Sequence, residues 1–317
     1  MPDISMVDYP PLLAASAWLD LGVRTSMATI VAIDGKSPRT IGAQMAVAES
    51  GLTQGYLTGG CLEAEFSLRA KQVMADGANS LERYGKGSKY FDLRLPCGSG
   101  IDIYFDQALR PEVLQAAQSH MKARQPFGIE IALSNGVSTI NDRLNDYIQL
   151  PMDAGRFQRL YLPPVRTLVF GSGAAPIQLA SLLRFFGMQA ELKATDTATL
   201  DQARAQGLDA SILRDGNDLP QLDAWTACVL AFHEHVLELP LLHNLLHSPA
   251  FYIGAVGSKS VGQTRRDRLI ELGFSPEQLA RIIAPAGAVR GARSATELAV
   301  GLLAEILDSA RQNKLVV

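Results

Sequence analysis

The feature that most constrains the fold is a glycine turn in the C-terminal half of the chain. Residues 166–170 form a largely apolar run, which is typical of a strand buried on both faces of a parallel sheet. Gly171-Ser172-Gly173 follows directly, and residues 174–186 have the pattern of a helix. A buried strand, a glycine turn and a helix in this order are typical of a Rossmann-like nucleotide-binding unit.

The two glycines of this turn and the acid that follows them suggest a nucleotide ligand. Gly171 suits the tight turn, and Gly173 lets the main chain approach a pyrophosphate at the helix N-terminus. Asp196 ends the next predicted strand, where a carboxylate commonly binds a ribose hydroxyl. Pro176 replaces the third glycine of the usual pattern. The motif predicts a ligand that carries a pyrophosphate, such as NAD or FAD, and the glycines do not distinguish one dinucleotide from another; the alternative is a turn kept only for its structural role.

Strands and helices continue to alternate after this turn. The alternation predicts a doubly wound parallel sheet, because each parallel pair of strands needs a crossover, usually helical. A final helix is expected after Ser294, which forms a capping box with Glu297. The expected strands are 166–170, 189–194, 227–232 and 251–256, and the expected helices are 174–186, 200–205, 239–246 and 259–272.

The N-terminal half lacks this regular alternation and predicts a separate, mixed α/β domain. We expect this domain at residues 1–150, a proline-bearing linker at 151–164 and the Rossmann-like domain at 165–317. The expected N-terminal strands are 25–33, 44–48, 55–58, 89–95 and 101–105, with a hairpin of 127–135 and 137–141 and helices at 12–21, 62–75 and 111–123.

Composition excludes several classes of function. Of the 317 residues 47% are hydrophobic and 19% charged, and the net charge is −3. This composition is typical of a folded protein with a sizeable core, and it lacks the basic patches that nucleic acid requires. No apolar run is long enough to span a membrane, and residues 1–10 do not resemble a secretion signal. We therefore expect a cytoplasmic protein without nucleic-acid or membrane partners.

Two of the three cysteines lie in glycine-rich turns. Cys61 follows a glycine pair at the start of a helix, where the helix dipole favours a thiolate. Cys97 follows a predicted strand and precedes a second glycine-rich turn. Functional thiols and small residues buried in tight turns are both open interpretations of this pair. Cys228 lies inside a predicted strand and is expected in the core.

Several histidines follow the predicted strand 227–232. His233 and His235 come directly after it, at the edge of the sheet where α/β proteins bind ligands. His243 and His247 are one turn apart on the next helix but lack the glutamate of a zinc-protease motif. A cofactor contact by His233 and a structural role are both open, and a metal site would need a further ligand.

These motifs, in this order, resemble those of the XdhC/CoxI family. The resemblance covers nearly the whole chain, and the pairing of the two cysteine turns with a Rossmann half is specific. The motifs that carry it are Gly35–Arg39, Gly42–Met45, Gly59–Glu63, Pro96–Gly100, Phe170–Gly173, His233, Tyr252–Ser258, Ala284–Gly287 and Gly291–Ile306.

The resemblance implies a chaperone for molybdenum hydroxylases such as xanthine dehydrogenase and aldehyde oxidoreductases. Such a protein would bind molybdenum cofactor, protect it while a cysteine desulfurase exchanges an oxo for a sulfido ligand, and deliver it to the apoenzyme. The resemblance also implies a homodimer. Thiolates suit a soft molybdenum–sulfur centre, so Cys61 and Cys97 would contact the metal. The other implied cofactor-binding residues are Arg39, Gly59, Gly60, Glu63, Gly98, Gly171, Gly173, Asp196, His233 and Ser258.

A few positions depart from the family pattern. The loop at 258–260 is Ser-Lys-Ser where Ser-Arg-Arg is usual, which removes guanidinium groups that bind phosphate. Arg265 and Arg266 lie further along, on a helix face that we expect to be solvated. The alternative function is an NAD(P)- or FAD-dependent oxidoreductase. Against it, the sequence has no convincing catalytic His-Asp or Tyr-x-x-x-Lys arrangement.

Overall fold

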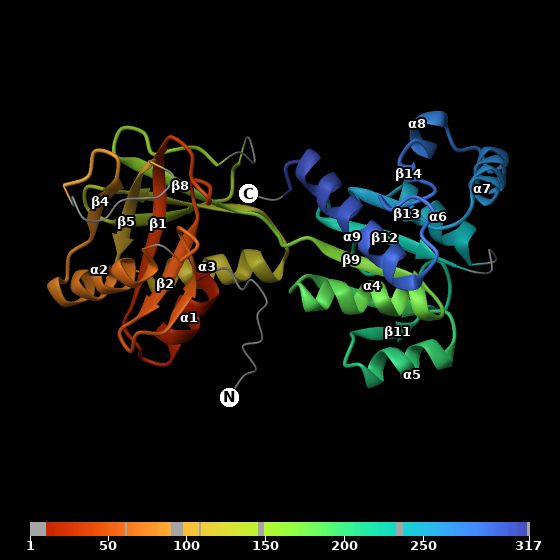
Figure 1. Cartoon of the computed structure of the whole chain (residues 1–317), viewed down its shortest axis with the longest axis horizontal. Helices are drawn as coiled ribbons and strands as arrows, with labels where there is room; N and C mark the ends of the chain where they lie inside the picture. The colour runs from red at the N-terminus through yellow and green to blue at the C-terminus, as the bar shows by residue number, and fades with distance from the viewer. Residues whose placement is uncertain are drawn as a thin grey trace. The chain divides into compact units, whose positions relative to one another are not determined.

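The chain forms two compact units, one ending at Pro163 and the other starting at Pro164 (Figure 1). The structure is a computed structural model that describes residues 11–60, 62–89, 98–107, 109–144, 149–232 and 237–315. The segment 151–164, which we expected to be a linker, contains strand β8, Arg156–Tyr161. Most of that segment therefore belongs to the N-terminal unit, because β8 pairs with another strand of that unit.

A five-stranded antiparallel sheet forms the centre of the described part of the N-terminal unit. Its strand order is β3 (Thr53–Gly55), β2 (Gln44–Ala48), β1 (Thr25–Asp34), β5 (Gly100–Asp106) and β4 (Ser80–Gly85). The central strand β1 is buried on both faces, which explains its nearly continuous apolar sequence. Helix α2 (Glu63–Asp76) packs on one face, and helices α1 (Pro11–Asp20) and α3 (Pro111–Lys122) pack on the other.

A smaller antiparallel sheet completes the described N-terminal unit. Its order is β7 (Val137–Asn141), β6 (Phe127–Ala132) and β8, so the predicted hairpin is confirmed. The rings of Phe127 and Tyr161 stack with their centroids 4.9 Å apart and join β6 to β8. The strand expected at 55–58 instead lies at 53–55, because the main chain after Gly55 turns to bind a side chain of α2. Strand β4 was not predicted, and the strand expected at 89–95 lies almost wholly outside the described residues.

The C-terminal unit is the predicted doubly wound parallel sheet, in the classical Rossmann order. The strands lie in the order β11 (Ala210–Ile212), β10 (Gln189–Ala194), β9 (Arg166–Gly171), β12 (Thr226–Ala231), β13 (Tyr252–Ala255) and β14 (Ile282–Ile283). Helices α4 (Ala174–Phe185), α5 (Thr197–Ala205) and α9 (Ala295–Gln312) cover one face, and α6 (Glu238–Leu246) and α7 (Lys259–Glu271) the other. A short helix α8 spans Pro276–Leu279.

The strand order fixes where a ligand would bind. The order reverses between β9 and β12, which pair in parallel with Gly171 beside Ala231. A crevice outside the carboxyl ends of the strands at such a reversal is the usual ligand site of open α/β sheets. The glycine turn after β9 lies at this position, as the sequence predicted.

The start of α9 matches the predicted cap in part. The hydroxyl of Ser294 accepts the main-chain N–H of Glu297 at 3.1 Å. The carboxylate of Glu297, however, accepts the N–H of Arg293 at 2.7 Å instead of that of Ser294. The cap is therefore displaced by one residue from the ideal capping box.

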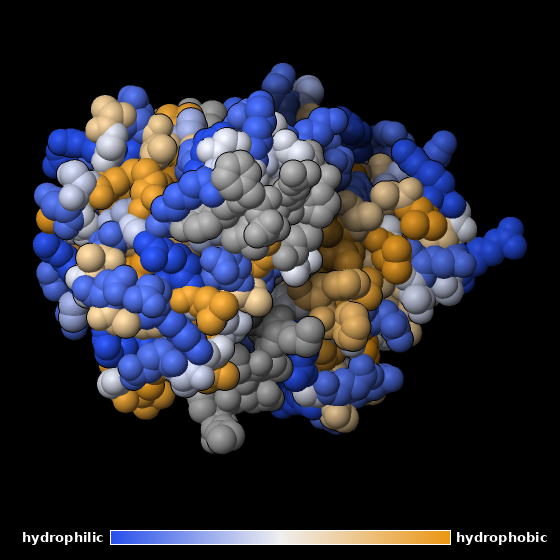
Figure 2. All heavy atoms as spheres, turned by 60° about the vertical axis from the view of Figure 1, so that its left-hand side comes forward, coloured by the Kyte–Doolittle hydropathy of each residue, from blue (hydrophilic) through white to orange (hydrophobic). Residues whose placement is uncertain are grey.

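The face in Figure 2 carries many charged and polar side chains, with single apolar ones among them and a group of apolar ones to the right of the centre. The most exposed large apolar residues of the N-terminal unit come from separate elements and loops, namely Leu21, Leu52, Leu68 and Leu150. Single apolar residues of this kind are common on soluble domains. Within the described ranges no helix is long and apolar enough to cross a membrane.

Candidate functional site

The first glycine turn of the N-terminal unit is organised by one carboxylate. Glu63 accepts the main-chain N–H groups of Leu57 (3.1 Å), Thr58 (2.7 Å), Gly59 (3.0 Å) and Gly60 (2.8 Å). It also accepts the hydroxyl of Thr58 at 2.8 Å. Glu63 begins α2, so this helix folds the preceding turn around its own first side chain.

The electrostatics of Glu63 follow from these bonds. Burial raises its pKa, but the hydrogen bonds from Thr58 and Leu57 outweigh burial, and the net pKa lies below its ordinary value. The carboxylate is therefore charged at neutral pH and satisfies the loop amides that would otherwise face an external anion. Gly59 and Gly60 have φ values of +78° and +113°, which only glycine adopts readily. Glu63, predicted as a cofactor contact, thus holds the turn that carries Cys61.

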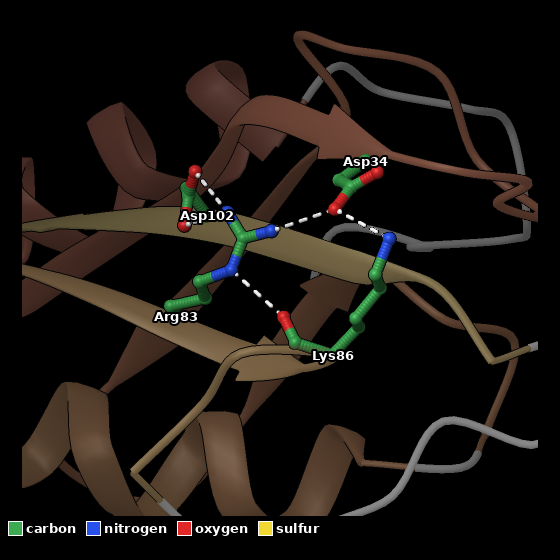
Figure 3. A network of polar contacts seen from close by, with 4 residues as sticks. All are labelled: Asp34, Arg83, Lys86 and Asp102. Atoms are coloured by element: carbon green, nitrogen blue, oxygen red, sulfur yellow. Dashed lines mark hydrogen bonds and ion pairs between the residues drawn. The ribbon is translucent and has the colours of Figure 1, made fainter.

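A polar network fixes the sheet edge at which the second cysteine turn enters β5 (Figure 3). Arg83 donates to both carboxylate oxygens of Asp102 at 3.0 and 3.2 Å and to Asp34 at 3.3 Å. Lys86 pairs with Asp34 at 3.3 Å, and its carbonyl accepts Arg83 Nε at 2.8 Å. The network thus joins the carboxyl ends of β1 and β4 to the start of β5.

The second turn packs directly against this network. Gly98 has a φ of +67°, and the carbonyl of the buried Ser99 accepts the N–H of Lys86 at 2.9 Å. Gly100 lies so close to Arg83 that a Cβ there would come within 2.6 Å of its guanidinium. Gly98 and Ser99, which directly follow Cys97 in the sequence, therefore lie at this charged end of the strands.

Arg39 lies beside the first glycine turn. Its guanidinium stacks on the ring of Tyr56 at 4.4 Å from the centroid and donates to the Tyr56 hydroxyl at 3.2 Å. Tyr56 directly precedes the residues that bind Glu63. The predicted residues Arg39, Gly59, Gly60 and Glu63 therefore lie in one region of the N-terminal unit.

The glycine turn of the C-terminal unit is shaped by close packing and by internal hydrogen bonds. A Cβ at Gly171 would come within 2.1 Å of the carbonyl oxygen of Ala231, so only glycine allows β9 and β12 to meet. The N–H of Gly173 donates to the hydroxyl of Thr199 at 2.8 Å. Asp196 in turn accepts that hydroxyl at 2.9 Å and the Thr199 N–H at 2.7 Å.

Asp196 therefore has a structural role as the N-cap of α5. Hydrogen bonds from the main chain and the hydroxyl of Thr199 lower its pKa. A carboxylate can accept several hydrogen bonds, so the bonds to Thr199 do not block a further donor. The geometry is thus compatible with the predicted ribose contact.

Ser258 caps α7, and a cavity lies against the same helix. The Ser258 hydroxyl accepts the N–H of Val261 at 3.3 Å and bonds the hydroxyl of Ser260 at 2.8 Å. The cavity has a volume of about 260 Å³ and lies between two helices. Its lining residues are Glu238 and Leu239 of α6 and Ser260, Val261, Thr264, Arg265 and Arg268 of α7.

Arg265, expected on a solvated face, is instead buried. Its guanidinium lies 2.7 Å from Glu238, and the two side chains are 4% and 2% exposed. It also donates to the carbonyl of Val256 at 3.2 Å, which ties α7 to the end of β13. The sequence of α7 suggested a solvated face, but α6 covers the side of α7 that carries Arg265, and Glu238 of α6 supplies the carboxylate that pairs with it.

Three predicted contacts lie outside the described residues: Cys61, Cys97 and His233. Cys228 lies in β12 and is fully buried, as predicted, and burial raises its pKa to about 12. Among the described residues no group of three His, Cys, Asp or Glu side chains could hold a metal ion.

Sequence reasoning missed two residues that shape these sites. Thr199 was overlooked although the Asp196-x-x-Thr199 spacing at a helix start is a capping signal. Arg159 was assigned to the linker, and it lies on β8 with its guanidinium 4.9 Å from the ring centroid of Tyr161. No local signal marks it, because its surroundings come from distant parts of the chain.

Comparison with known proteins agrees with this two-unit architecture. Residues 18–85 match the XdhC and CoxI family, and residues 167–306 match the XdhC Rossmann domain. The molybdenum cofactor insertion chaperone PaoD of Escherichia coli (strain K12) is 32% identical over 288 residues, covering 88% of this chain and 81% of PaoD. A probable xanthine dehydrogenase subunit of Bacillus subtilis (strain 168) is 22% identical over 319 residues, covering 90% of this chain and 93% of the relative.

A solved structure shares the fold over nearly the whole chain. It is a Bacillus halodurans protein described as a xanthine dehydrogenase, with a TM-score of 0.76 and 20% sequence identity. The match covers 97% of this chain and 96% of the other. At this identity the likeness establishes the fold alone.

The fold and the sites thus define a two-unit α/β protein with a glycine turn organised by Glu63 in one unit and a Rossmann sheet in the other. With the two family matches and the relative at 32% identity, the chain belongs to the XdhC/CoxI family.

Proposed function

We propose that this protein is a molybdenum cofactor insertion chaperone. It binds the cofactor as cargo, protects it, assists its sulfuration and delivers it to a hydroxylase of the xanthine dehydrogenase or aldehyde oxidoreductase type. The observation that carries the proposal is the similarity to the insertion chaperone PaoD over 88% of the chain. The turn around Glu63 supports it, because the carboxylate holds the main chain of the turn that precedes Cys61 in the sequence.

In this proposal Cys61 and Cys97 supply thiolates to the molybdenum–sulfur end of the cargo. Soft thiolate ligands suit such a centre. Glu63 holds the first turn through main-chain hydrogen bonds. The network of Arg83 with Asp34 and Asp102 holds the end of the sheet where the second turn meets β5. The protein's contribution is positioning and exclusion of water, without turnover of its own.

The C-terminal unit would hold a nucleotide portion if the cargo is a dinucleotide form. Gly171 and Gly173 lie at the reversal of strand order, and Asp196 and Ser258 end the neighbouring turns there. His233 comes two residues after the end of β12 in the sequence. We propose these residues as the nucleotide contacts.

Cofactor analysis of the purified full-length protein tests the proposal. The protein is made in a host that synthesises molybdenum cofactor, and molybdenum and pterin are measured per chain. We expect near-stoichiometric pterin in the wild type and a loss in Cys61→Ala or Cys97→Ala. Cys228→Ala is the matched control, because this thiol is buried in the C-terminal core. Absence of pterin from the wild type would remove the carrier assignment.

The proposed partners are a cysteine desulfurase and the hydroxylase apoprotein, with the chaperone as a cytoplasmic homodimer. Pull-down of each purified partner with the loaded chaperone tests the contacts, and sedimentation tests the dimer. Delivery predicts that an inactive hydroxylase gains activity when the loaded chaperone is added. If free cofactor activates it equally well, the insertion role is wrong.

The second candidate is an NAD(P)- or FAD-dependent oxidoreductase. The observation that favours it is the complete Rossmann strand order with a glycine turn at the reversal. It predicts saturable NAD(P) or FAD binding and hydride transfer to an acceptor. Pterin in the purified protein, together with no hydride transfer, would favour the chaperone function over the oxidoreductase function.

A further inference from the structure

Two arginines of the N-terminal unit are linked through one shared neighbour and have no carboxylate partner among the described residues. Arg39 follows β1, and Arg159 lies on β8. The turn that carries Arg39 packs on the same side chain that contacts Arg159: a Cβ at Gly42 would meet Gln149 at 2.9 Å. Gln149 Oε1 lies 3.4 Å from Arg159 Nη1. The two arginines are thus held in one neighbourhood by Gln149.

Arg159 is a cation placed largely away from water. Its Nη1 donates to Gln149 and to the carbonyl of Leu160, and its guanidinium lies 4.9 Å from the ring centroid of Tyr161. Its Nε is buried and has no hydrogen-bond partner. Burial lowers the pKa of Arg159, and the positive charge of Arg39 lowers it further.

Arg39 has the same pattern of satisfied and unsatisfied donors. Its Nη1 donates to Tyr56, whose ring also stacks on the guanidinium. Its Nε, like that of Arg159, is buried without a partner. Each guanidinium is thus fixed by one aromatic ring and keeps donors that no described side chain accepts.

This arrangement is costly for the protein alone. A buried donor without a hydrogen-bond partner destabilises the folded protein, and like charges near each other add to that cost. An anion that accepts from both guanidinium groups removes both costs. The planar donor fork of arginine fits phosphate oxygens better than a lysine ammonium would.

We propose that Arg39 and Arg159 form a binding site for a phosphate monoester. If the proposed function is correct, the ligand is the phosphate that ends the pterin part of the cargo, held in the same unit as Cys61 and Cys97. A dianion with several oxygens matches two guanidinium groups, whereas a single carboxylate would leave donors unpaired. The site differs from the glycine turn of the C-terminal unit, which lies at the Rossmann sheet.

Thermal unfolding of the full-length, cofactor-free protein tests the site. Inorganic phosphate is titrated against potassium chloride of equal ionic strength, and binding is obtained from the rise in Tm. We expect a saturable rise in the wild type and an apparent affinity at least ~10-fold weaker in Arg39→Gln and Arg159→Gln. Arg39→Gln keeps the test decisive if Arg159→Gln does not fold.

Arg156→Gln is the matched control. Arg156 lies on the same strand, its side chain is 74% exposed and it pairs with Glu130 at 3.4 Å. Its variant should keep the phosphate response of the wild type. Equal responses in all four proteins, or a response to chloride as large as that to phosphate, would overturn the proposal.

Two further probes separate the sources of the phosphate. Glycerol 3-phosphate carries a monoester, and ADP carries a pyrophosphate. We expect glycerol 3-phosphate to reproduce the effect of phosphate and to lose it in Arg39→Gln. An ADP response abolished by Arg39→Gln, without a glycerol 3-phosphate response, would overturn the monoester assignment.

These probes contain neither pterin nor molybdenum, so they test the site independently of the cargo. Pterin that co-purifies with a protein insensitive to phosphate would remove this site and leave the chaperone function. If phosphate binding depends on both arginines but the protein never carries pterin, the site is supported and the assignment of its ligand to the molybdenum cofactor is wrong.

Discussion

Removing the carboxylate of Glu63 should destabilise the N-terminal unit measurably. In Glu63→Ala the N–H groups of Leu57, Thr58, Gly59 and Gly60 lose their common acceptor. Water can replace it at Gly59 and Gly60, which are exposed. Leu57 and Thr58 are 0% and 5% exposed, so their amides are reached less easily.

The magnitude follows from those two amides. A buried donor left unpaired costs about 1–2 kcal/mol, so the variant should lose about 2–4 kcal/mol. For a domain of about 150 residues this corresponds to a fall in Tm of about 4–15 °C. Differential scanning calorimetry of the full chain should show the shift in one transition, because the C-terminal unit keeps its contacts.

The pH dependence has a definite sign. The folded-state pKa of Glu63 lies below the ordinary value of 4.5, so its contribution is fully present above that pH. It is lost as the pH falls through the folded-state pKa. The difference in Tm between the wild type and Glu63→Gln should therefore be constant at neutral pH and shrink in acid.

Glu65→Gln is the control for the loss of charge in the same helical turn. Glu65 also lies in the first turn of α2, without the bonds that Glu63 makes. We expect a change of less than about 1 kcal/mol, as for most surface substitutions. If Glu65→Gln and Glu63→Gln lower Tm equally, the effect is that of a charge near the helix N-terminus and the reasoning on the loop is refuted.

The remaining predictions concern the C-terminal unit. Gly171→Ala should lower the free energy of unfolding in urea by more than about 3 kcal/mol, because the φ of +142° and a main-chain carbonyl leave no room for a side chain. Gly273→Ala, where a Cβ meets open space, should lower it by about 1 kcal/mol. Equal losses in the two variants would contradict the packing argument. Glu238→Gln should destabilise by about 3–5 kcal/mol because it leaves Arg265 charged and buried, and the double variant Glu238→Leu with Arg265→Met should recover much of that loss. Cys228 should resist iodoacetamide at pH 8 in the native protein, because burial raises its pKa to about 12, and it should react after unfolding in urea; rapid labelling of the native thiol would show that it is accessible.

The Rossmann unit was predictable because its local and global signals agree. Strand β9 is apolar along its length, as a strand buried on both faces must be, and the glycine turn follows at the expected place. The central β12 has the same character, so alternation with helices sufficed to give the sheet type. The short outer strands β11 and β14 were missed, because two or three residues carry no periodicity.

The N-terminal unit was less predictable because its polar strands lack a clear apolar face. In β4, Ser80–Gly85, only Glu82 and Tyr84 are buried, and a buried glutamate hides the alternation. Glu82 is held there by Arg69 at 2.8 Å, a contact across two elements. Similarly, β8 lies between prolines that resemble linker punctuation, and only its pairing with β6 makes it a strand.

The two glycine motifs illustrate a limit of motif-based prediction. The turn after β9 was interpreted from sequence as a pyrophosphate site, and the turn before α2 as a setting that favours a thiolate at Cys61. In the structure the N–H of Gly173 is bound by Thr199, and the N–H groups of Gly59 and Gly60 are bound by Glu63. A glycine pattern specifies a main-chain path, whereas the side chain that fills it decides whether an anion can enter.

Buried donors without a hydrogen-bond partner in the described part of the N-terminal unit include the Nε atoms of Arg39 and Arg159. An anionic cargo gains most where donors are already desolvated and unpaired, because binding there relieves a cost that the free protein bears. The glycine turn, with its amides bound to Glu63, offers no such gain. The charge balance of this unit therefore favours recognition of the anionic end by the arginines and leaves the cysteine turns for the metal end of the same cargo.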